Sequence, residues 1–123
     1  DGEIFVNTFE RGVGFTNACG TAMSASSLVT ILSGLHEYEK TLIVYNNGGY
    51  VKTIVHNQGG KQWIDLIGNG TYEYDGDVTV DLEKETIEHV VKIHLYEDEA
   101  EQYKRIEQRA KKKRMELFGK EKI

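Results

Sequence analysis

The sequence predicts an α+β fold in which a mainly antiparallel β-sheet wraps around a central buried helix and a charged helix follows at the C-terminal end. Three observations lead to this prediction. Residues 12–35 form a run of 24 residues without a charge, although 28% of the chain is charged. Residues 41–82 contain short β-type segments separated by Gly- and Asn-rich turns. Residues 97–118 are highly charged, with acidic side chains first and basic ones last, an order that suits the helix dipole.

The uncharged run predicts the central helix, which we expect to begin at Cys19 and to end near Gly34. Small residues fill its first half, and larger apolar residues follow from Leu28 to Leu32. A helix that is small or apolar on every face is typically surrounded by other elements. A membrane span is the alternative interpretation, but seven Ser or Thr residues within the run argue against it. We therefore expect a buried core helix.

The start of this helix carries the first candidate site, Ala18-Cys19-Gly20-Thr21. The first backbone N–H groups of a helix have no helical partners, so such a terminus attracts anions and favours a thiolate. Gly20 leaves room for a ligand to approach the backbone. We expect Asn17 to cap the helix, with Thr21 sharing that role. The competing interpretation is that Cys19 is only a small buried hydrophobic residue.

A second candidate site precedes the helix. Residues 3–9 alternate like a strand, and Glu10-Arg11 follow, with Gly12 and Gly14 predicting a tight turn from strand to helix. Glu10 and Arg11 serve either a ligand or a surface ion pair of little energetic value. A dinucleotide-binding turn is rejected, because Asn17 occupies the position of the third glycine and no acidic residue follows at the required spacing.

The remainder of the chain is predicted to alternate between strands and turns. Asn46-Asn47-Gly48-Gly49 predicts a hairpin, and Asp75-Gly76 predicts either a hairpin turn or a bulge. Residues 1–82 are expected to form one lobe, and residues 83–123 an extra strand and a charged helical tail. The expected strands are residues 41–45, 50–56, 61–67, 71–74, 77–82 and 87–96. The tail contains a heptad repeat that forms a thin seam along the expected helix, and this seam is suited to docking on a neighbour. Its residues are Tyr96, Tyr103, Ala110 and Leu117.

Composition and charge exclude several classes of protein. The net charge of −5 and the pI of about 5.4 argue against a nucleic-acid partner. The basic run at residues 111–114 is interpreted as a solvated helix face rather than an RNA or membrane contact. The single cysteine excludes an internal disulfide and suits a reducing compartment such as the cytoplasm. The four histidines lack the spacing of metal ligands, so no metal site is expected. The first residues lack the pattern of a signal peptide and enter a strand at once, so we expect a segment of a longer protein.

Two motifs together resemble a known family. Phe9-Glu10-Arg11-Gly12-Val13-Gly14, followed by Asn17-Ala18-Cys19-Gly20-Thr21, is similar to the C-terminal half of diaminopimelate epimerase. The pairing of E-R-G with A-C-G-T is specific, whereas either motif alone is weak. The resemblance extends from about Glu3 to about Val80, because the family closes with a strand like Thr71-Tyr-Glu-Tyr-Asp-Gly76. The tail beyond Glu83 is not covered.

The resemblance implies a cofactor-independent epimerase that interconverts LL- and meso-diaminopimelate for lysine and peptidoglycan synthesis. In that family two cysteines act on opposite faces of the α-carbon, and Cys19 matches the one from the C-terminal half. Gly20 and Thr21 match positions that bind the reacting carboxylate, and Glu10 and Arg11 match the pair that holds the substrate. The second cysteine and the N-terminal lobe are absent from this sequence. We therefore expect no turnover by this chain alone.

Two residues depart from the family pattern. Ala22 occupies a position that is usually glycine, and Phe15 occupies a position that is usually glutamate. Neither is a matched catalytic position. Two alternatives remain open, a related proline-racemase-like isomerase that acts on another acid, and a non-catalytic binding or assembly module that uses helix 97–118. Strands that lack their usual neighbours would leave exposed edges, for which a homodimer is one expected outcome.

Overall fold

The computed structural model describes residues 2–119 and confirms the α+β class. The chain divides into two compact units, residues 1–69 with 106–123, and residues 70–105. The strands form three separate sheets rather than the single wrapped sheet that was expected.

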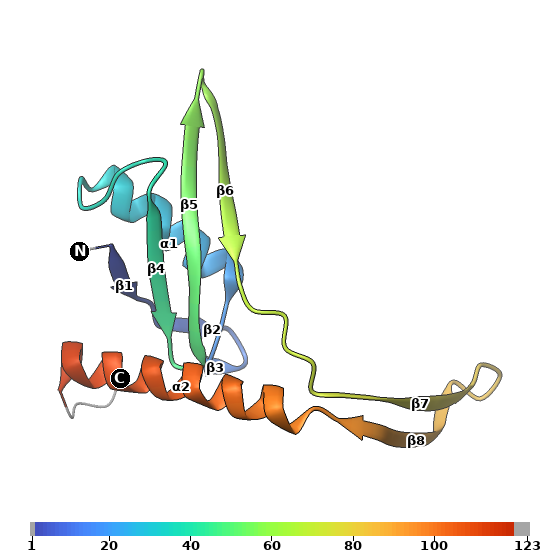
Figure 1. Ribbon diagram of the computed structural model, residues 1–123. Helices are drawn as coiled ribbons and strands as arrows, with labels where there is room; N and C mark the ends of the chain where they lie inside the picture. Colours follow the sequence, from blue (N-terminus) through green and yellow to red (C-terminus); the bar gives the residue numbers. More distant parts are fainter. Residues whose placement is uncertain (1, 120–123) are drawn as a thin grey trace. The chain divides into compact units, whose positions relative to one another are not determined.

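The first unit is built on a four-stranded sheet with the order β1-β4-β5-β6 (Figure 1). Strand β1 runs parallel to β4, whereas β4, β5 and β6 form consecutive antiparallel hairpins. The turn at Asn47-Gly48 is the one that the Asn- and Gly-rich sequence predicts. The strands are β1 (Glu3–Phe5), β4 (Thr41–Asn46), β5 (Gly49–Gln58) and β6 (Lys61–Ile67).

The predicted strand at residues 3–9 is interrupted, and the chain forms a second, small sheet. Strand β2 (Thr8–Glu10) pairs with β3 (Gly14–Thr16) in an antiparallel hairpin. The glycines after Glu10-Arg11 therefore turn the chain from strand to strand and not from strand to helix, which corrects the expectation. Gly12 and Gly14 both adopt positive φ angles, 81° and 92°, which glycine accepts without steric cost.

Helix α1 (Gly20–Leu32) begins at the expected place and packs on one face of the four-stranded sheet. Met23, Ser27 and Ile31 are its buried residues, and they lie four positions apart on a single helix face. On the other side, Val29 is 60% exposed and Leu32 is 69% exposed. A sheet that encloses the helix is therefore not confirmed, because the described strands line only one side of it.

The core between α1 and the sheet combines an apolar cluster with a buried polar pair. Met23 packs with Leu42 and Val44. Beside them, the hydroxyl of Ser27 donates to the backbone oxygen of Met23 at 2.8 Å and shares a hydrogen bond of 2.7 Å with the hydroxyl of Thr53. Ser27 and Thr53 are both fully buried, and each hydroxyl has a hydrogen-bond partner. The hydrogen bonds offset the cost of removing the hydroxyls from water, and they link α1 to β5.

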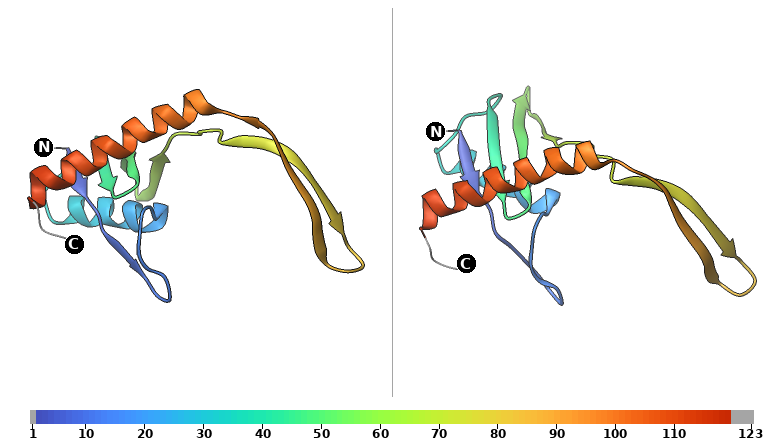
Figure 2. Two further views of the ribbon diagram at one scale, coloured as in Figure 1. Left: turned by 90° about the horizontal axis from the view of Figure 1, so that it is seen from below. Right: turned by 60° about the horizontal axis from the view of Figure 1, so that its bottom comes forward.

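Helix α2 spans Glu97–Phe118, and its residues from Ile106 onward belong to the first unit. This part of α2 packs on the face of the sheet opposite to α1 (Figure 2). Ala110 is fully buried, so one position of the predicted heptad seam docks on the chain's own sheet. The guanidinium carbon of Arg109 lies 4.7 Å from the centre of the Tyr50 ring, a cation–π contact. Lys113 forms an ion pair with Glu3, which raises the pKa of Lys113 and lowers that of Glu3.

A charged cluster ties the loop before β4 to strands β5 and β6. His56 on β5 contacts Glu39 through Nδ1 and Asp65 through Nε2, the latter at 2.9 Å, and its side chain is only 14% exposed. Trp63 stacks on the imidazole ring with centroids 4.5 Å apart. A carboxylate only accepts hydrogen bonds and a neutral imidazole has one N–H, so both bonds require the imidazolium. Asp65 and then Glu39 accordingly raise the pKa of His56.

This cluster predicts a pH-dependent stability. Because folding raises the pKa of His56 above its ordinary value of 6.5, its contribution is fully present below that pH and is lost as pH rises through the raised pKa. The pKa of Glu39 is lowered, first by the backbone N–H of Asn57 and then by His56. Glu39 therefore stays ionised, and its contribution to stability is lost only in acid. We expect the urea midpoint to fall as the pH rises from about 6 through the raised pKa of His56.

The variant His56→Gln should flatten that fall in urea midpoint, because glutamine does not titrate. His89→Gln, which removes an exposed histidine from the other unit, serves as the control and should keep the wild-type pH dependence. An NMR titration of the His56 ring measures its pKa directly. A pKa at or below the ordinary value, or an unchanged pH slope in His56→Gln, would contradict the assignment.

The second unit consists of a two-stranded antiparallel ribbon and the start of α2. Strand β7 (Tyr74–Asp81) pairs with β8 (Thr86–Leu95), with register shifts at Asp75-Gly76 and at Thr79-Val80. The shift at Asp75-Gly76 agrees with the bulge, one of the two expectations for these residues, and not with a hairpin turn. The strand expected at residues 71–74 is wrong, because only Tyr74 is extended there, as the first residue of β7. Tyr96 donates to Asp75 at 2.8 Å, and this carboxylate raises the pKa of the Tyr96 hydroxyl. The boundary predicted after residue 82 falls in the β7–β8 turn, and the domain division stays a prediction.

Candidate active site

The predicted site residues lie on two adjoining segments of the first unit, the β2–β3 hairpin and the beginning of α1. Cys19 is the N-cap of α1 and has an extended backbone, with φ −150° and ψ 103°. Its carbonyl accepts the first helical hydrogen bond, from the N–H of Met23 at 3.0 Å. The expectation that Asn17 and Thr21 cap the helix is therefore wrong, and no side chain of the described residues forms a cap hydrogen bond at this terminus.

An N-terminus without a side-chain cap leaves the first N–H groups of the helix for another acceptor. The groups concerned are those of Gly20, Thr21 and Ala22, which precede the first satisfied N–H at Met23. The Sγ atom of Cys19 lies 3.6 Å from the hydroxyl oxygen of Thr21, and the thiol is half-buried. One helix turn thus presents a thiol, a hydroxyl and free backbone donors together, which is a geometry suited to a carboxylate.

Gly20 is closely approached by the neighbouring sheet. A Cβ at this position would lie 3.0 Å from the Cδ2 atom of Leu66 on β6. The missing side chain therefore keeps the helix end close to the sheet.

The connection into α1 is held by the β4–β5 turn. The N–H of Gly48 donates to the carbonyl of Asn17 at 2.9 Å and also to the side-chain oxygen of Asn46 at 3.1 Å. Asn46 is buried, and its amide nitrogen lies 3.2 Å from the sulfur of Met23 on α1. Gly48 thereby holds Asn17, which lies two residues before Cys19, and Asn46 links Gly48 to α1. Sequence reasoning interpreted them only as a hairpin turn, because nothing local indicates which segment the turn will contact.

The E-R-G motif occupies the β2–β3 hairpin. Glu10 is half-buried and accepts a hydrogen bond of 3.2 Å from the hydroxyl of Thr16 across the hairpin. The N–H of Val13 donates to the carbonyl of Glu10 at 3.0 Å and closes the turn. Arg11 is exposed, and no hydrogen bond or ion pair within the described residues joins it to Glu10. The surface ion pair that was the alternative interpretation is therefore not formed.

The structure brings Cys19 next to Thr21, and Glu10 next to Thr16, but no hydrogen bond in the described part joins the two groups. The residues that depart from the family pattern both lie outside these contacts. Phe15 is exposed on β3, and its ring packs edge-to-face with that of Phe9, with the ring centroids 5.4 Å apart. Ala22 is half-buried in the first turn of α1.

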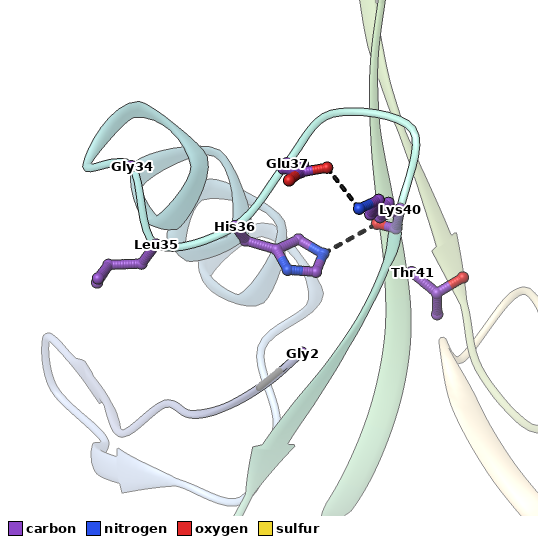
Figure 3. A pocket seen from close by; sticks show the side chains of 7 residues that line it. All are labelled: Gly2, Gly34, Leu35, His36, Glu37, Lys40 and Thr41. Carbon is purple, nitrogen blue, oxygen red and sulfur yellow. Dashed lines mark hydrogen bonds and ion pairs between the residues drawn. The ribbon is translucent and has the colours of Figure 1, made fainter.

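A separate hollow of about 420 Å³ lies at the opposite end of α1 (Figure 3). Its charged side chains are paired within one loop, where Lys40 contacts Glu37 at 2.5 Å and the ring of His36 lies 3.2 Å from the carbonyl of Lys40. None of the predicted site residues lines it.

Within residues 2–119, no group of three or more His, Cys, Asp or Glu side chains is arranged to hold a metal ion. Neither helix of the described chain is long and apolar enough to span a membrane.

Comparison with known proteins confirms the resemblance drawn from the two motifs. The chain is 60% identical over 73 residues to diaminopimelate epimerase of Ligilactobacillus salivarius, covering 57% of this chain and 22% of that protein. It is 46% identical over 86 residues to that of Clostridium acetobutylicum, covering 69% of this chain and 25% of that protein. The identity to the enzyme of Lactiplantibacillus plantarum is 57% over 74 residues, covering 56% of this chain and 22% of that protein.

The chain thus spans about a quarter of the length of the curated relatives that it matches. No family model matches it. No solved structure matches it either.

Proposed function

We propose that the chain is a segment of a cofactor-independent diaminopimelate epimerase and carries one of the two cysteines that move the α-proton. The complete enzyme would interconvert LL- and meso-diaminopimelate in the cytoplasm, for lysine and peptidoglycan synthesis. The observation that carries the proposal is the half-buried thiol of Cys19 at a helix terminus without a side-chain cap, 3.6 Å from Thr21. Identities of 46–60% to enzymes of that name support it.

The chemistry requires stabilisation of negative charge. Removing the α-proton of an amino acid builds carbanion character next to a carboxylate, and preorganised donors at that carboxylate lower the barrier. The N–H groups of Gly20 and Thr21 and the hydroxyl of Thr21 would supply these donors. The positive end of the α1 dipole adds to the same potential. Glu10 and Arg11 would hold the substrate from the β2–β3 hairpin.

The proton balance requires a second residue. In one direction Cys19 as a thiolate accepts the α-proton, its S–H bond forms as the C–H bond breaks, and a thiol on the opposite face returns a proton to the carbon. In the other direction the roles exchange. Because the sequence has one cysteine, the partner thiol would come from the remainder of the enzyme. We therefore propose that this chain alone catalyses no inversion.

The proposal is tested in a chimera in which residues of this chain replace the 73-residue matched segment of the Ligilactobacillus salivarius epimerase. We expect the chimera to convert LL- to meso-diaminopimelate and to exchange the α-proton with D₂O. The isolated chain, run beside it, should do neither. A folded chimera that binds no diaminopimelate but racemises proline or another acid would favour the related isomerase. A folded chimera without any isomerase activity would overturn the assignment to an enzyme.

A further inference from the structure

The part of helix α2 that belongs to the first unit packs on the β4–β5 hairpin beside its turn. The Cγ2 atom of Ile106 faces Gly49, the first residue of β5, where an added Cβ would lie 3.1 Å from it. Ile106 is half-buried, and Ala110, one helical turn further along, is fully buried. The absence of a side chain at Gly49 therefore lets the helix lie directly against the turn.

Arg109 contacts both strands that meet in this turn. Its guanidinium carbon lies 4.7 Å from the centre of the Tyr50 ring on β5 and 5.8 Å from that of Tyr45 on β4. Its Nη1 also donates to the hydroxyl of Tyr50 at 3.4 Å. Tyr45 and Tyr50 are paired in the register of the hairpin, with ring centroids 5.5 Å apart. A single cation on α2 thus joins the two arms of the hairpin next to its turn.

The same turn contacts the segment that leads into Cys19. Gly48, the neighbour of Gly49, donates its N–H to the carbonyl of Asn17 at 2.9 Å. Consecutive residues of the turn therefore contact α2 and the Asn17 segment. A displacement of the turn would be transmitted to a residue that lies two positions before Cys19.

The helix terminus at Cys19 needs such external support. No side chain of the described residues caps α1, and an uncapped terminus frays more readily. A reacting group has to stay within about 0.5 Å of its productive position, held by residues that packing itself fixes. The contacts of Ile106 and Arg109 supply that kind of packing to the turn.

We infer that Ile106 and Arg109 are positioning residues of the epimerase, which hold the β4–β5 turn against Asn17 and thereby fix the helix terminus that carries Cys19. This inference rests on the proposed function. It gives α2, which lies beyond the residues that the family motifs cover, a role at the active site that requires no contact between α2 and the substrate.

The first test measures amide hydrogen exchange at Gly48 in the folded full chain. Ile106→Ala removes the Cγ2 atom that faces Gly49, so exchange of the Gly48 N–H should accelerate by at least about 10-fold. Ile106→Val retains a methyl group at that position and should keep the parental rate. Met115→Ala, at an exposed position of the same helix, is the matched control and should keep it as well.

The second test uses a chimera in which the complete chain, with α2, replaces the matched segment of the Ligilactobacillus salivarius epimerase. Ile106→Ala and Arg109→Ala should each lower kcat for α-proton exchange by about 10-fold with little change in KM, because only the alignment of the thiol changes. In a Gly48→Ala background, Ile106→Ala should cause little further loss, since both substitutions act through one turn. Val55→Ala truncates a buried side chain six positions from Gly49, and it should lower the urea midpoint but keep kcat.

Unchanged exchange at Gly48 in Ile106→Ala would overturn the inference whether or not the chimera is an enzyme. Parental kcat in both α2 variants would also overturn it. An equal loss of kcat in Val55→Ala would do the same, because it would assign the effect to general stability. Faster Gly48 exchange in Ile106→Ala, together with a folded parental chimera that has no epimerase activity, would overturn the proposed function while the support of the turn by α2 stands.

Discussion

Cys19→Ser in the chimera should lower the rate of α-proton exchange of diaminopimelate by about 10²–10⁴-fold, the range by which a positioned acid–base group accelerates proton transfer. A serine hydroxyl is nearly isosteric with the thiol and keeps the N-cap position of α1, but it is far too weak an acid to cycle between base and acid. The loss should appear in kcat rather than in KM, because the N–H groups that would bind the carboxylate stay in place.

The measurement is exchange of the α-proton in D₂O, followed by NMR. Ser33→Ala, at the exposed C-terminal end of the same helix, is the control and should keep the parent rate. Full activity in Cys19→Ser would show that the thiol packs and does not react. A rise in KM with an unchanged kcat would assign Cys19 to substrate binding alone.

Gly48→Ala should have the second largest effect, on both stability and activity. A Cβ on Gly48 would lie 2.9 Å from the carbonyl oxygen of Asn17 and 3.0 Å from its Cβ. The obstructing atoms are backbone or directly attached to it, so no rotamer change relieves the contact. We expect a loss of about 1–3 kcal/mol in the free energy of unfolding, the usual cost of overpacking.

The same substitution should slow the chimera by about 10²-fold, because the Asn17 segment leads directly into Cys19 and a shift of about 1 Å in a reacting group is that costly. Urea unfolding of the chain and exchange kinetics of the chimera measure the two effects. Gly70→Ala is the matched control, since nothing lies within 4 Å of its added Cβ, and it should be neutral. Wild-type stability together with wild-type exchange in Gly48→Ala would show that the β4–β5 turn does not position the site.

Several helices, strands and turns were predicted because the pattern that specifies each of them lies within its own residues. Residues 61–67 and 97–118 were predicted as a strand and a helix, and β6 and α2 have the same bounds. The turn at Asn47-Gly48 was also predicted, because Asn and Gly tolerate the backbone conformations that turns require. At Asp75-Gly76 a hairpin turn and a bulge were both expected, and the register shift there agrees with the bulge. The start of α1 beside Cys19 follows from the same kind of local chemistry.

The site was predicted in part. The motif led to Cys19, Gly20 and Thr21, and the structure places all three at one helix terminus. The roles of these three residues and of Glu10 and Arg11 stay predictions. The hairpin that carries Glu10 and Arg11 was expected to be a strand-to-helix turn. Asn46 and Gly48 were missed as positioning residues, because Asn46 contacts Met23, 23 positions away, and Gly48 contacts Asn17, which is farther still along the chain.

The sequence by itself therefore determined the class of the fold, most of its helices and strands, and the family that the two motifs resemble. Periodicity and turn chemistry act over a few residues, so they can be recognised in the chain alone. Only the tertiary structure decided that the strands form three sheets, that α1 is covered on one side and that the second half of α2 packs on the other face of the sheet. Those outcomes depend on which distant surfaces bury apolar area against one another, and no local pattern encodes that choice.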